Sequence, residues 1–436
     1  MRWYGSFQKT DTPLDSFWGN NLFFMSKTIW FVNKEAAPSS EFATHMRTLR
    51  QAKFFQDKGY EVKVFCSAVV HNSKIVHKFK GICHEEIHDD VPLVFVKCPE
   101  YGESFVKRVL SFFIFSINML RIKMDKKPDI IVHESKTPFD ILCMRLARKY
   151  RARYIVDIED LWPFEFEQVG ILSHNNPILK LCYRAQRFIY SKGEHVVISE
   201  EGGRDYIKER KWDKEQGGPI DINRVHYVNN GINLAEFIHN AEHNVIYDND
   251  LTDDNFFKVI YLGSIRRANN LDQLLDAAKS LSAEKKIKIY IYGDGPERNA
   301  LEERCQKERI DNVVFKNRWI ELKYVPYVLS HADLHILNYG KNWAPYGGSM
   351  NKMMMAFASG KPMVCNADLP YSEINRHNLG VDKVFNSPEE YAQAIKSICD
   401  MPKDEYGAMC NRVKEVALRY DINYLCERFA EYCEIK

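Results

Sequence analysis

The sequence carries little net charge and no paired cysteines. Its 436 residues include 61 Lys and Arg against 59 Asp and Glu, which gives a formal net charge of +2. A charge this small provides no bulk field that would attract nucleic acid. The 11 cysteines are scattered, and none of them forms a CxxC pair. An odd number of cysteines, mostly within apolar runs, fits the reduced thiols of a cytoplasmic protein better than a disulfide framework or a zinc site.

Two kinds of nucleotide-binding loop are also missing. After Gly293-Asp294-Gly295, a dinucleotide fingerprint requires a third glycine where Arg298 stands. No glycine-rich loop ends in Lys followed by Ser or Thr. A hydride-transfer enzyme and a nucleoside triphosphatase are therefore both disfavoured. Residues 1–25 lack the basic start and apolar centre of a signal peptide, and we expect them to be an extension outside the fold.

What the sequence does contain is a repeated alternation of short apolar strands and amphipathic helices. A chain of this length is too long for a single core, so two domains are expected. Strand–helix–strand units with this spacing predict parallel sheets that bind ligands at the carboxyl ends of their strands. The predicted class is α/β, with the first domain at 26–234, a polar linker at 235–256 and the second domain at 257–420.

A glycine turn followed by a short apolar helix is the clearest candidate site. Gly347 and Gly348 permit a close backbone approach, and Ser349 is predicted to cap a helix that begins at Met350. Residues 353–358 are apolar on every side, so this helix should be buried. Its N-terminus would then present free N–H groups and the positive end of a dipole to phosphate. The alternative is an ordinary core helix behind a glycine turn.

Two adjacent arginines follow a strand of the second domain. The predicted strand 258–262 ends at Gly263, and Arg266 and Arg267 come shortly after it. The planar guanidinium group suits phosphate because it can bind two oxygens at once. These arginines and the helix start at 349–352 could therefore hold one diphosphate from two sides. The alternative is a pair of solvated surface arginines.

Residues 104–124 have the composition of a surface-seeking helix. Lys107 and Arg108 precede the uncharged run 109–120, and Arg121 and Lys123 follow it. A run of this length cannot span a bilayer, which needs about 20 apolar residues. Aromatic bulk flanked by bases suits a helix that lies on an anionic membrane surface. The alternative is a core helix that covers the sheet.

Several short motifs, taken together in their order, resemble glycosyltransferase family four. In the second half they are Tyr292-Gly293-Asp294-Gly295-Pro296, Asn312-Val313-Val314-Phe315, His331-Ala332-Asp333-Leu334 and Ala358-Ser359-Gly360-Lys361-Pro362; in the first half they are Asp160-Leu161-Trp162-Pro163, Val197-Ile198-Ser199 and Val228-Asn229-Asn230-Gly231-Ile232-Asn233. The resemblance covers the chain from about residue 27 onward, and the bacterial enzymes of surface-polysaccharide assembly look most similar. It implies the GT-B fold, which consists of two facing Rossmann-like domains with the nucleotide-sugar in the second. It also implies that the C-terminal helix, in 421–436, returns to the first domain.

The resemblance implies roles for individual residues. Transfer would retain the anomeric configuration. The sequence shows no cluster of residues with metal-ligand spacing, so we expect no metal and no other cofactor. The implied catalytic residues are Asp160, Arg266 and Lys352; the implied donor-binding residues are Gly263, Arg267, Asp294, Arg318, Trp319, Tyr346, Gly347, Gly348, Ser349, Met350 and Asn351; and the acceptor-side candidates are Ser39, Ser40, His133 and Glu134. The donor would be a nucleoside diphosphate-sugar, with uracil as the base, and the acceptor a saccharide or a lipid-linked saccharide. For His133 the alternative is a structural histidine at the end of a strand.

Two positions depart from the family pattern. The family usually has an acid on the helix after the glycine turn to hold the nucleotide ribose, but Met355 stands there and cannot accept strong hydrogen bonds. The family's glycine pair near the donor phosphates is replaced by Ser39-Ser40-Glu41. Two other readings therefore stay open: a non-catalytic scaffold protein of a polysaccharide-assembly complex, and a nucleotide-sugar epimerase of the same fold.

Overall fold

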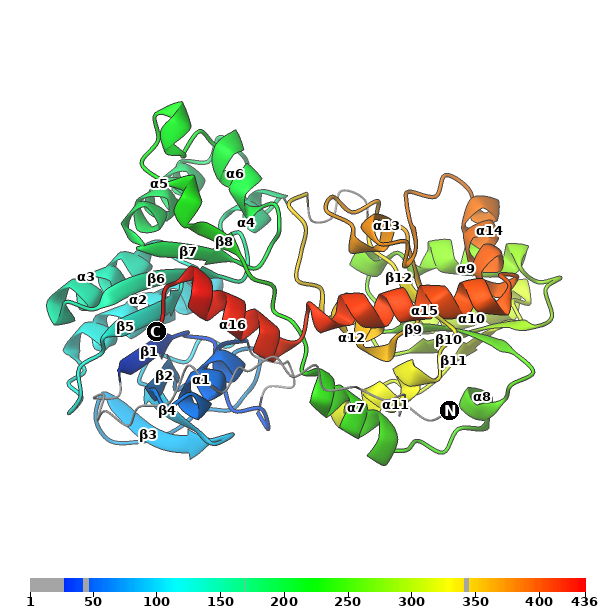
Figure 1. Ribbon diagram of the computed structural model, residues 1–436, viewed down its shortest axis with the longest axis horizontal. Helices are drawn as coiled ribbons and strands as arrows, with labels where there is room; N and C mark the ends of the chain where they lie inside the picture. The colour runs from blue at the N-terminus through cyan, green and yellow to red at the C-terminus, as the bar shows by residue number, and fades with distance from the viewer. Residues whose placement is uncertain (1–26, 42–46, 169, 341–344) are drawn as a thin grey trace, which may run out of the picture.

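The computed structural model describes residues 27–41, 47–168, 170–340 and 345–436, which form two α/β domains side by side (Figure 1). The extension predicted at 1–25 lies outside the described residues, as does the start of the helix predicted from residue 42. In the described chain all 11 cysteines are free thiols. None of the helices described here has the length and apolarity needed to cross a membrane.

The first domain is built on an eight-stranded sheet in the spatial order β3, β4, β2, β1, β5, β6, β7, β8. Only the pair β3 and β4 is antiparallel. The strands are β1 (Thr28–Val32), β2 (Glu61–Ser67), β3 (Cys83–His88), β4 (Val91–Val96), β5 (Ile130–Glu134), β6 (Arg153–Ile158), β7 (His195–Ile198) and β8 (Val225–Tyr227). The central strands β1 and β5 are buried along their whole length, because helices cover both faces of the sheet.

The second domain has a six-stranded, wholly parallel sheet in the order β11, β10, β9, β12, β13, β14. Its strands are β9 (Phe257–Leu262), β10 (Ile287–Tyr292), β11 (Val313–Phe315), β12 (Leu334–Leu337), β13 (Met363–Cys365) and β14 (Gly380–Asp382). In each sheet the strand order reverses at one place, between β1 and β5 and between β9 and β12. Ligands of open α/β sheets bind beyond the carboxyl ends of the strands at such points.

Helices cover both faces of each sheet. Those of the first domain are α1 (Arg47–Asp57), α2 (Phe105–Arg121), α3 (Ile141–Tyr150), α4 (Phe164–Gln168), α5 (Pro177–Lys192) and α6 (Gly203–Glu209). Those that follow are α7 (Leu234–His243), α8 (Asn249–Thr252), α9 (Leu271–Ser280), α10 (Arg298–Glu308), α11 (Val325–Ser330), α12 (Asn351–Ser359), α13 (Glu373–Arg376), α14 (Pro388–Cys399), α15 (Lys403–Leu418) and α16 (Ile422–Tyr432).

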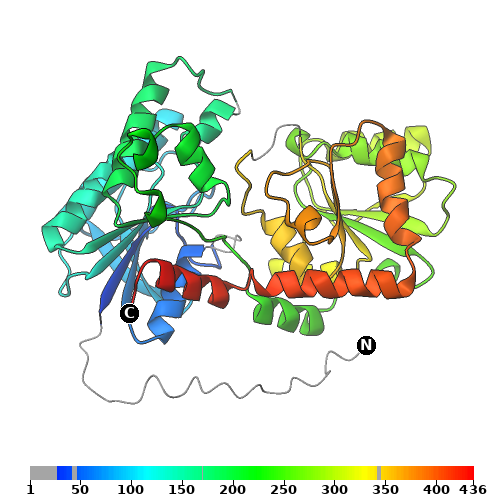
Figure 2. The ribbon, with the colours of Figure 1, turned by 45° about the horizontal axis from the view of Figure 1, so that its top comes forward.

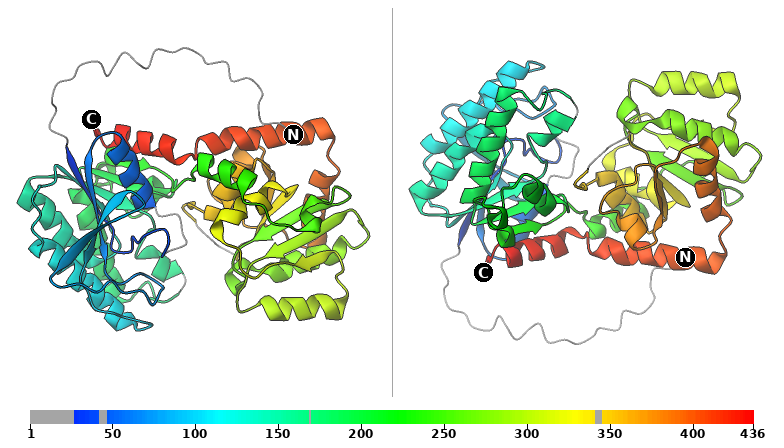
Figure 3. Two further views of the ribbon diagram at one scale, coloured as in Figure 1. Left: turned by 90° about the horizontal axis from the view of Figure 1, so that it is seen from below. Right: turned by 90° about the horizontal axis from the view of Figure 1, so that it is seen from above.

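The last helix returns to the first domain, as predicted. Helices α15 and α16 run along one side of both domains (Figure 2), and α16 ends beside α1 (Figure 3). Phe429 of α16 is fully buried against Phe55 of α1, with ring centroids 6.2 Å apart. Arg153 donates a hydrogen bond of 2.6 Å to the carbonyl oxygen of Cys433. The C-terminus therefore belongs to the core of the first domain.

Residues 235–256, predicted as a linker, hold the helices α7 and α8. Phe237 of α7 is buried in the core of the second domain, beside Val328 and Phe357. The polar composition of this stretch reflects the outer faces of short helices, whose few apolar residues carry the packing. The exact domain limits remain a prediction.

Candidate functional site

A cleft of about 850 Å³ lies between the carboxyl ends of the two sheets. Its walls combine acids of the first domain with the glycine turn and the start of α12 from the second. The lining includes Glu159, Asp160, Glu165, Glu200, Ser264 and residues 347–352. Asp160, Lys352 and the predicted donor-binding residues Gly347, Gly348, Ser349, Met350 and Asn351 are thus brought to one place, although they come from opposite halves of the chain.

The helix α12 begins at Asn351, with Met350 as its N-cap. Ser349, predicted as the cap, does not have this role. Its hydroxyl donates to the carbonyl oxygen of Ser199 (2.8 Å) and accepts from the backbone N–H of Asn230 (3.2 Å), both in the first domain. Among the described residues no side chain caps the first turn of α12. The N–H groups of Asn351 and Lys352 belong to this first turn and so have no intrahelical partner. This leaves donors available to an anion in the cleft.

Lys352 is a lysine without an acidic partner among the described residues. Its Nζ donates to the hydroxyl of Tyr261 (2.9 Å) and lies 4.7 Å from the centre of that ring. Burial lowers the pKa of the Lys352 amine to about 8, because the low-polarity surroundings disfavour its charged form. An anionic ligand would reverse this effect by pairing with the ammonium group. The position of Lys352 therefore suits phosphate binding.

Gly263 makes room for Lys352. A Cβ atom at Gly263 would lie 2.2 Å from Cε and 2.5 Å from Nζ of this lysine. Gly263 also has φ +151°, and a Cβ at Gly293 would lie 1.9 Å from the Gly263 carbonyl oxygen. The ends of β9 and β10 thus approach each other too closely for side chains. The glycines that follow these strands shape the floor of the site beside Lys352.

Arg266 and Arg267 are exposed. Their backbone carbonyl oxygens accept from the N–H groups of Asn269 and Asn270, but no hydrogen bond or ion pair of their guanidinium groups is found within the described chain. Their neighbours Ser264 and Ala268 line the cleft. The two arginines therefore stand at its edge, and their contact with a diphosphate stays a prediction.

The residues predicted to seat the base form a separate group. Arg318 pairs with Asp294 at 2.9 Å and donates to the side-chain oxygen of Asn299 at 2.6 Å. Trp319 is 73% exposed. These residues follow β10 and β11, whereas the cleft lining described above follows β9 and precedes α12. A base stacked on Trp319 would therefore lie away from the centre of the cleft.

The first domain contributes an acidic wall to the cleft. Loss of water in the cleft raises the pKa of the Glu165 carboxyl to about 7, with a further contribution from Asp160. Burial, together with Glu165 and Asp160, raises the pKa of Glu200 to about 8. Burial likewise raises the pKa of Asp160. Glu165 and Glu200 can therefore hold or accept a proton near neutral pH, which is the property required for handling the proton of an acceptor hydroxyl.

Glu165 and Glu200 were not predicted as site residues from the sequence. Glu165 belongs to α4, close behind the Asp-Leu-Trp-Pro stretch, and Glu200 follows β7 with only Ser199 between them. The position of Glu200 at a strand end was a usable signal. Glu165 had no comparable signal, because α4 is short and its orientation depends on tertiary packing.

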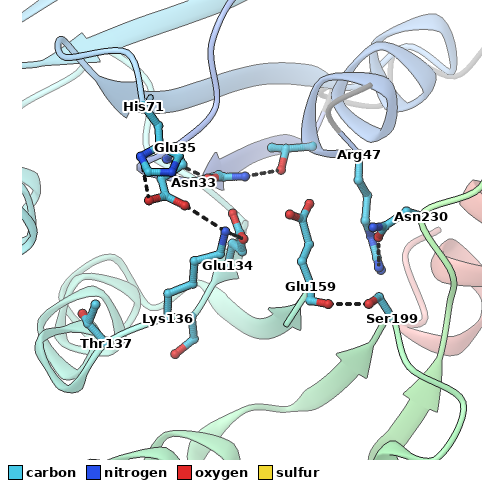
Figure 4. A network of polar contacts seen from close by, with 12 residues as sticks. Asn33, Glu35, Arg47, His71, Glu134, Lys136, Thr137, Glu159, Ser199 and Asn230 are labelled. Atoms are coloured by element: carbon cyan, nitrogen blue, oxygen red, sulfur yellow. Dashed lines mark hydrogen bonds and ion pairs between the residues drawn. The ribbon is translucent and has the colours of Figure 1, made fainter. Parts of the chain in front are cut away.

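A charged network continues behind this wall (Figure 4). The Glu35 carboxylate forms ion pairs with Nζ of Lys136 at 3.1 Å and with the guanidinium group of Arg108 at 2.9 Å. Burial alone would raise the pKa of Glu35, but Lys136, His71 and Arg108 lower it to about 2. Lys136 also pairs with Glu134 at 2.6 Å. Glu134 is therefore committed to a buried ion pair, and it lies beside a smaller pocket rather than in the main cleft.

The other acceptor-side candidates lie outside the cleft lining. His133 is buried, with its Nδ1 2.8 Å from the Tyr154 hydroxyl, so it is a structural histidine. Ser39 is exposed and donates its hydroxyl to Asp89 at 2.6 Å, and Ser40 is exposed beside it. The sequence predicted His133 at the end of a strand and Ser39 and Ser40 in a loop, but it could not show which way their side chains point.

The segment before α12 fastens the two domains together. Tyr346, predicted to line the donor site, instead packs against Phe164 and Tyr206 of the first domain, with both ring-centroid distances 5.2 Å. Its hydroxyl donates to Glu209 at 2.6 Å, and its carbonyl oxygen accepts from the N–H of Gly202 at 2.8 Å. The glycine turn at 347–348 is thus fixed in place by the first domain.

Over the ranges that the structure describes, no group of three or more His, Cys, Asp or Glu side chains is arranged to hold a metal ion. The positive groups at the cleft are Lys352 and the N-terminus of α12, with Arg266 and Arg267 at its edge.

Comparisons with known proteins agree with this arrangement. Residues 247–417 match the family model described as glycosyl transferases group 1, which supports the resemblance seen in the sequence. A comparison with curated protein sequences found no match. The sucrose-phosphate synthase of Thermosynechococcus elongatus is similar in structure, with a TM-score of 0.65 and 14% identity over 93% of this chain and 98% of its own.

Two further solved structures are similar. HepE of Anabaena in complex with UDP has a TM-score of 0.65 and 13% identity, covering 94% of this chain and 99% of that one. The pneumococcal O-GlcNAc transferase GtfA in complex with UDP and GlcNAc has a TM-score of 0.59 and 13% identity, covering 94% and 99%. At this level of identity the likeness establishes the fold, which is GT-B, as predicted.

Proposed function

We propose that this chain, in which residues 247–417 match the group 1 glycosyl transferases and both domains together have the GT-B fold, transfers a sugar from a nucleoside diphosphate. The observation that carries the proposal is Lys352, which stands without an acidic partner among the described residues, beside the uncapped start of α12 in the cleft. Uridine diphosphate is the proposed carrier. The solved structures of HepE and GtfA, both with UDP bound, support this choice.

The proposed chemistry depends on the charge of the leaving group. As the bond between the anomeric carbon and the phosphate oxygen breaks, negative charge gathers on the diphosphate. The Lys352 ammonium, the N–H groups at the start of α12 and the guanidinium groups of Arg266 and Arg267 would stabilise that charge. These fixed positive groups could replace a divalent ion, so the proposed reaction is metal-independent.

The acceptor would enter from the acidic wall. We propose a growing surface polysaccharide or a lipid-linked saccharide, with retention of the anomeric configuration. Asp160 is the proposed partner of the acceptor hydroxyl, and Glu165 and Glu200 lie in the same wall. A lipid-linked acceptor would place the protein on the inner face of the cell membrane, where α2 would be the contact.

The double variant Arg266→Ala with Arg267→Ala tests the diphosphate site. Removing two guanidinium groups should weaken UDP-glucose binding by at least about tenfold, because each charge-assisted hydrogen bond contributes roughly 1.5–3 kcal/mol. Titration calorimetry of the folded variant measures this directly. Arg309→Ala, an exposed arginine behind α10, is the matched control and should bind normally. Unchanged affinity in the double variant would remove both arginines from the donor site.

Donor binding should also depend on pH. The Lys352 pKa of about 8 lies below the ordinary lysine value of 10.5, so the amine of the free protein loses its proton as the pH rises through 8. Because UDP binds the charged form, its affinity should be constant below this pH and should fall above it by up to about tenfold per unit. Calorimetry in buffers from about pH 7 to 9.5 measures this. In Lys352→Met the decline should disappear, and a decline that persists would assign it to another group.

A non-catalytic scaffold remains the second candidate, because Met355 stands in α12 where an acid would hold the ribose. Its side chain is partly buried and packs on the core of the second domain. A screen of nucleotide sugars with lipid-linked acceptors separates the two candidates. Turnover, or even hydrolysis of the donor alone, would favour the enzyme, whereas a folded protein that neither binds nor cleaves any donor would favour the scaffold.

A further inference from the structure

Exposed apolar side chains are concentrated on two helices of the first domain. Of 17 large apolar residues that are exposed in the described chain, eight lie on α2 and α5: Phe105, Val106, Val109, Leu110, Phe113, Ile178, Leu181 and Phe188. On α2 they recur at helical spacing and form a continuous stripe. The helix α3 packs between α2 and α5, so the three helices make one continuous surface, which we call the α2–α3–α5 face. Apolar surface of this extent usually marks an interaction site.

The charged residues within these three helices are all basic, although Arg108 pairs with Glu35 of a neighbouring loop. The three helices contain no Asp or Glu, and they carry ten bases: Lys107, Arg108, Arg121, Arg145, Arg148, Lys149, Lys180, Arg184, Arg187 and Lys192. The chain as a whole has a net charge of only +2, so positive charge is segregated here. Apolar residues interleaved with bases, without acids, are the pattern of a surface that meets anionic lipid.

A basic recess extends the face at its far end. An open pocket of about 500 Å³ lies where α3 and α5 end, lined by Arg148, Arg151, Lys192 and Arg224. Its acid Glu194 already pairs with Arg153 at 2.8 Å. No acid of the described residues pairs with the other four bases. The recess therefore offers several free cations to phosphate groups that approach from one side.

The apolar part of the face lies next to the cleft. Each of the three helices runs antiparallel to the strands it covers, so α2 and α5 begin at the sheet edge that borders the cleft. Ile171, just before α5, is 63% exposed and also lines the cleft. A surface bound at Phe105, Val106 and Ile178 would thus lie close to the mouth of the cleft.

We propose that the α2–α3–α5 face docks the protein on an anionic lipid bilayer. The bases meet the headgroup phosphates, and the apolar side chains of α2 and α5 enter the boundary between headgroups and acyl chains. The acidic wall of the cleft then faces the layer from which a lipid-linked saccharide is presented. Only this last step rests on the proposed function; the docking itself does not require sugar transfer.

Vesicle co-sedimentation tests the docking. The wild-type protein should bind vesicles of phosphatidylcholine and phosphatidylglycerol at about 3:1 and should bind pure phosphatidylcholine at least tenfold more weakly. The variant Arg145→Glu, Arg148→Glu, Arg184→Glu should lose at least tenfold in affinity for the anionic vesicles. A matched variant of three exposed lysines of the second domain, Lys285→Glu, Lys307→Glu, Lys403→Glu, should bind like the wild type.

A second variant, Val106→Ser, Leu110→Ser, Leu181→Ser, tests the apolar part. It should retain binding at low salt but lose the fraction that survives about 0.5 M NaCl, where charge attraction is screened. Three outcomes would each overturn the proposal. The arginine and lysine triple variants could lose affinity equally, the wild type could bind neutral and anionic vesicles equally, or it could bind heparin but not vesicles. UDP affinity, measured on the same proteins, should be unchanged in every variant. If the wild-type protein binds anionic vesicles but does not bind UDP, the result counts against the sugar transfer and leaves the docking intact.

Discussion

Replacing Lys352 with alanine should lower kcat/KM for the nucleotide-sugar by about 10²–10³-fold, the usual cost of removing one preorganised donor from a developing negative charge. The loss should be large because the amine is the one lysine at the start of α12 within the cleft lining of the described structure. Its ammonium group has no acid to neutralise it there, so the leaving diphosphate meets its full charge. Steady-state release of UDP, with donor and acceptor varied in turn, measures the effect.

Two further variants sharpen this test. Lys323→Ala removes an exposed lysine that pairs with Glu321 at 3.0 Å on the same domain, and it should keep full activity. Gly263→Ala removes no charged group. Its added Cβ would stand where Cε and Nζ of Lys352 now lie, so the amine would have to move. It should therefore reproduce much of the loss seen in Lys352→Ala, while the far-ultraviolet spectrum stays that of the wild type. Full activity in both Lys352→Ala and Gly263→Ala would exclude this lysine from the reaction.

Most strands could be predicted because each is a short apolar run closed by glycine, proline or polar residues. The exceptions are β3, β8 and β14. The sequence Cys-His-Glu-Glu-Ile-His of β3 is largely polar because it forms an exposed antiparallel edge, which requires no buried side chains. The three residues of β14 begin with glycine and end with aspartate, so they carry no pattern of their own. Pairing with β13 alone makes them a strand.

The candidate site could be predicted where its function is local to one segment. The glycine turn, the start of α12 and Asp160 all follow strands or precede helices, and the structure gathers them in the cleft. Ser349 and Tyr346 could not be understood in this way, because their partners Ser199 and Glu209 lie in the other domain. From the sequence alone, a serine that caps a helix cannot be distinguished from a serine whose hydroxyl bonds to the other domain.

Arg47 gave no signal in the sequence, yet it anchors the first domain. It begins α1 and is almost wholly buried, with its guanidinium group 2.9 Å from the carboxylate of Asp157 at β6. It also donates to the carbonyl oxygen of Val228 at 2.7 Å, on the segment that leads to the second domain. In Figure 4 it lies across the cleft-side network from Lys136, with Glu159 between them. Burial raises the pKa of Asp157 to about 6, even though Arg47 lowers it.

Replacing Arg47 with methionine should lower the free energy of unfolding by about 3 kcal/mol near pH 8, because a buried carboxylate is left without its cation. The cost should shrink as the pH falls toward about 5. The sign follows from Asp157: its pKa in the folded state is already above the ordinary 3.8 and rises further without Arg47, so protonation removes the uncompensated charge. Urea unfolding at the two pH values measures both quantities.

The double variant Arg47→Met with Asp157→Asn should recover more than half of the loss, since no buried charge then remains unpaired. Lys126→Met, at a largely exposed pair with Glu61, is the control and should cost less than about 1 kcal/mol at either pH. A cost for Arg47→Met that is equally large at both pH values would show that lost packing and the lost hydrogen bond to Val228, rather than the charge of Asp157, dominate. In that case the double variant would be no more stable than Arg47→Met alone.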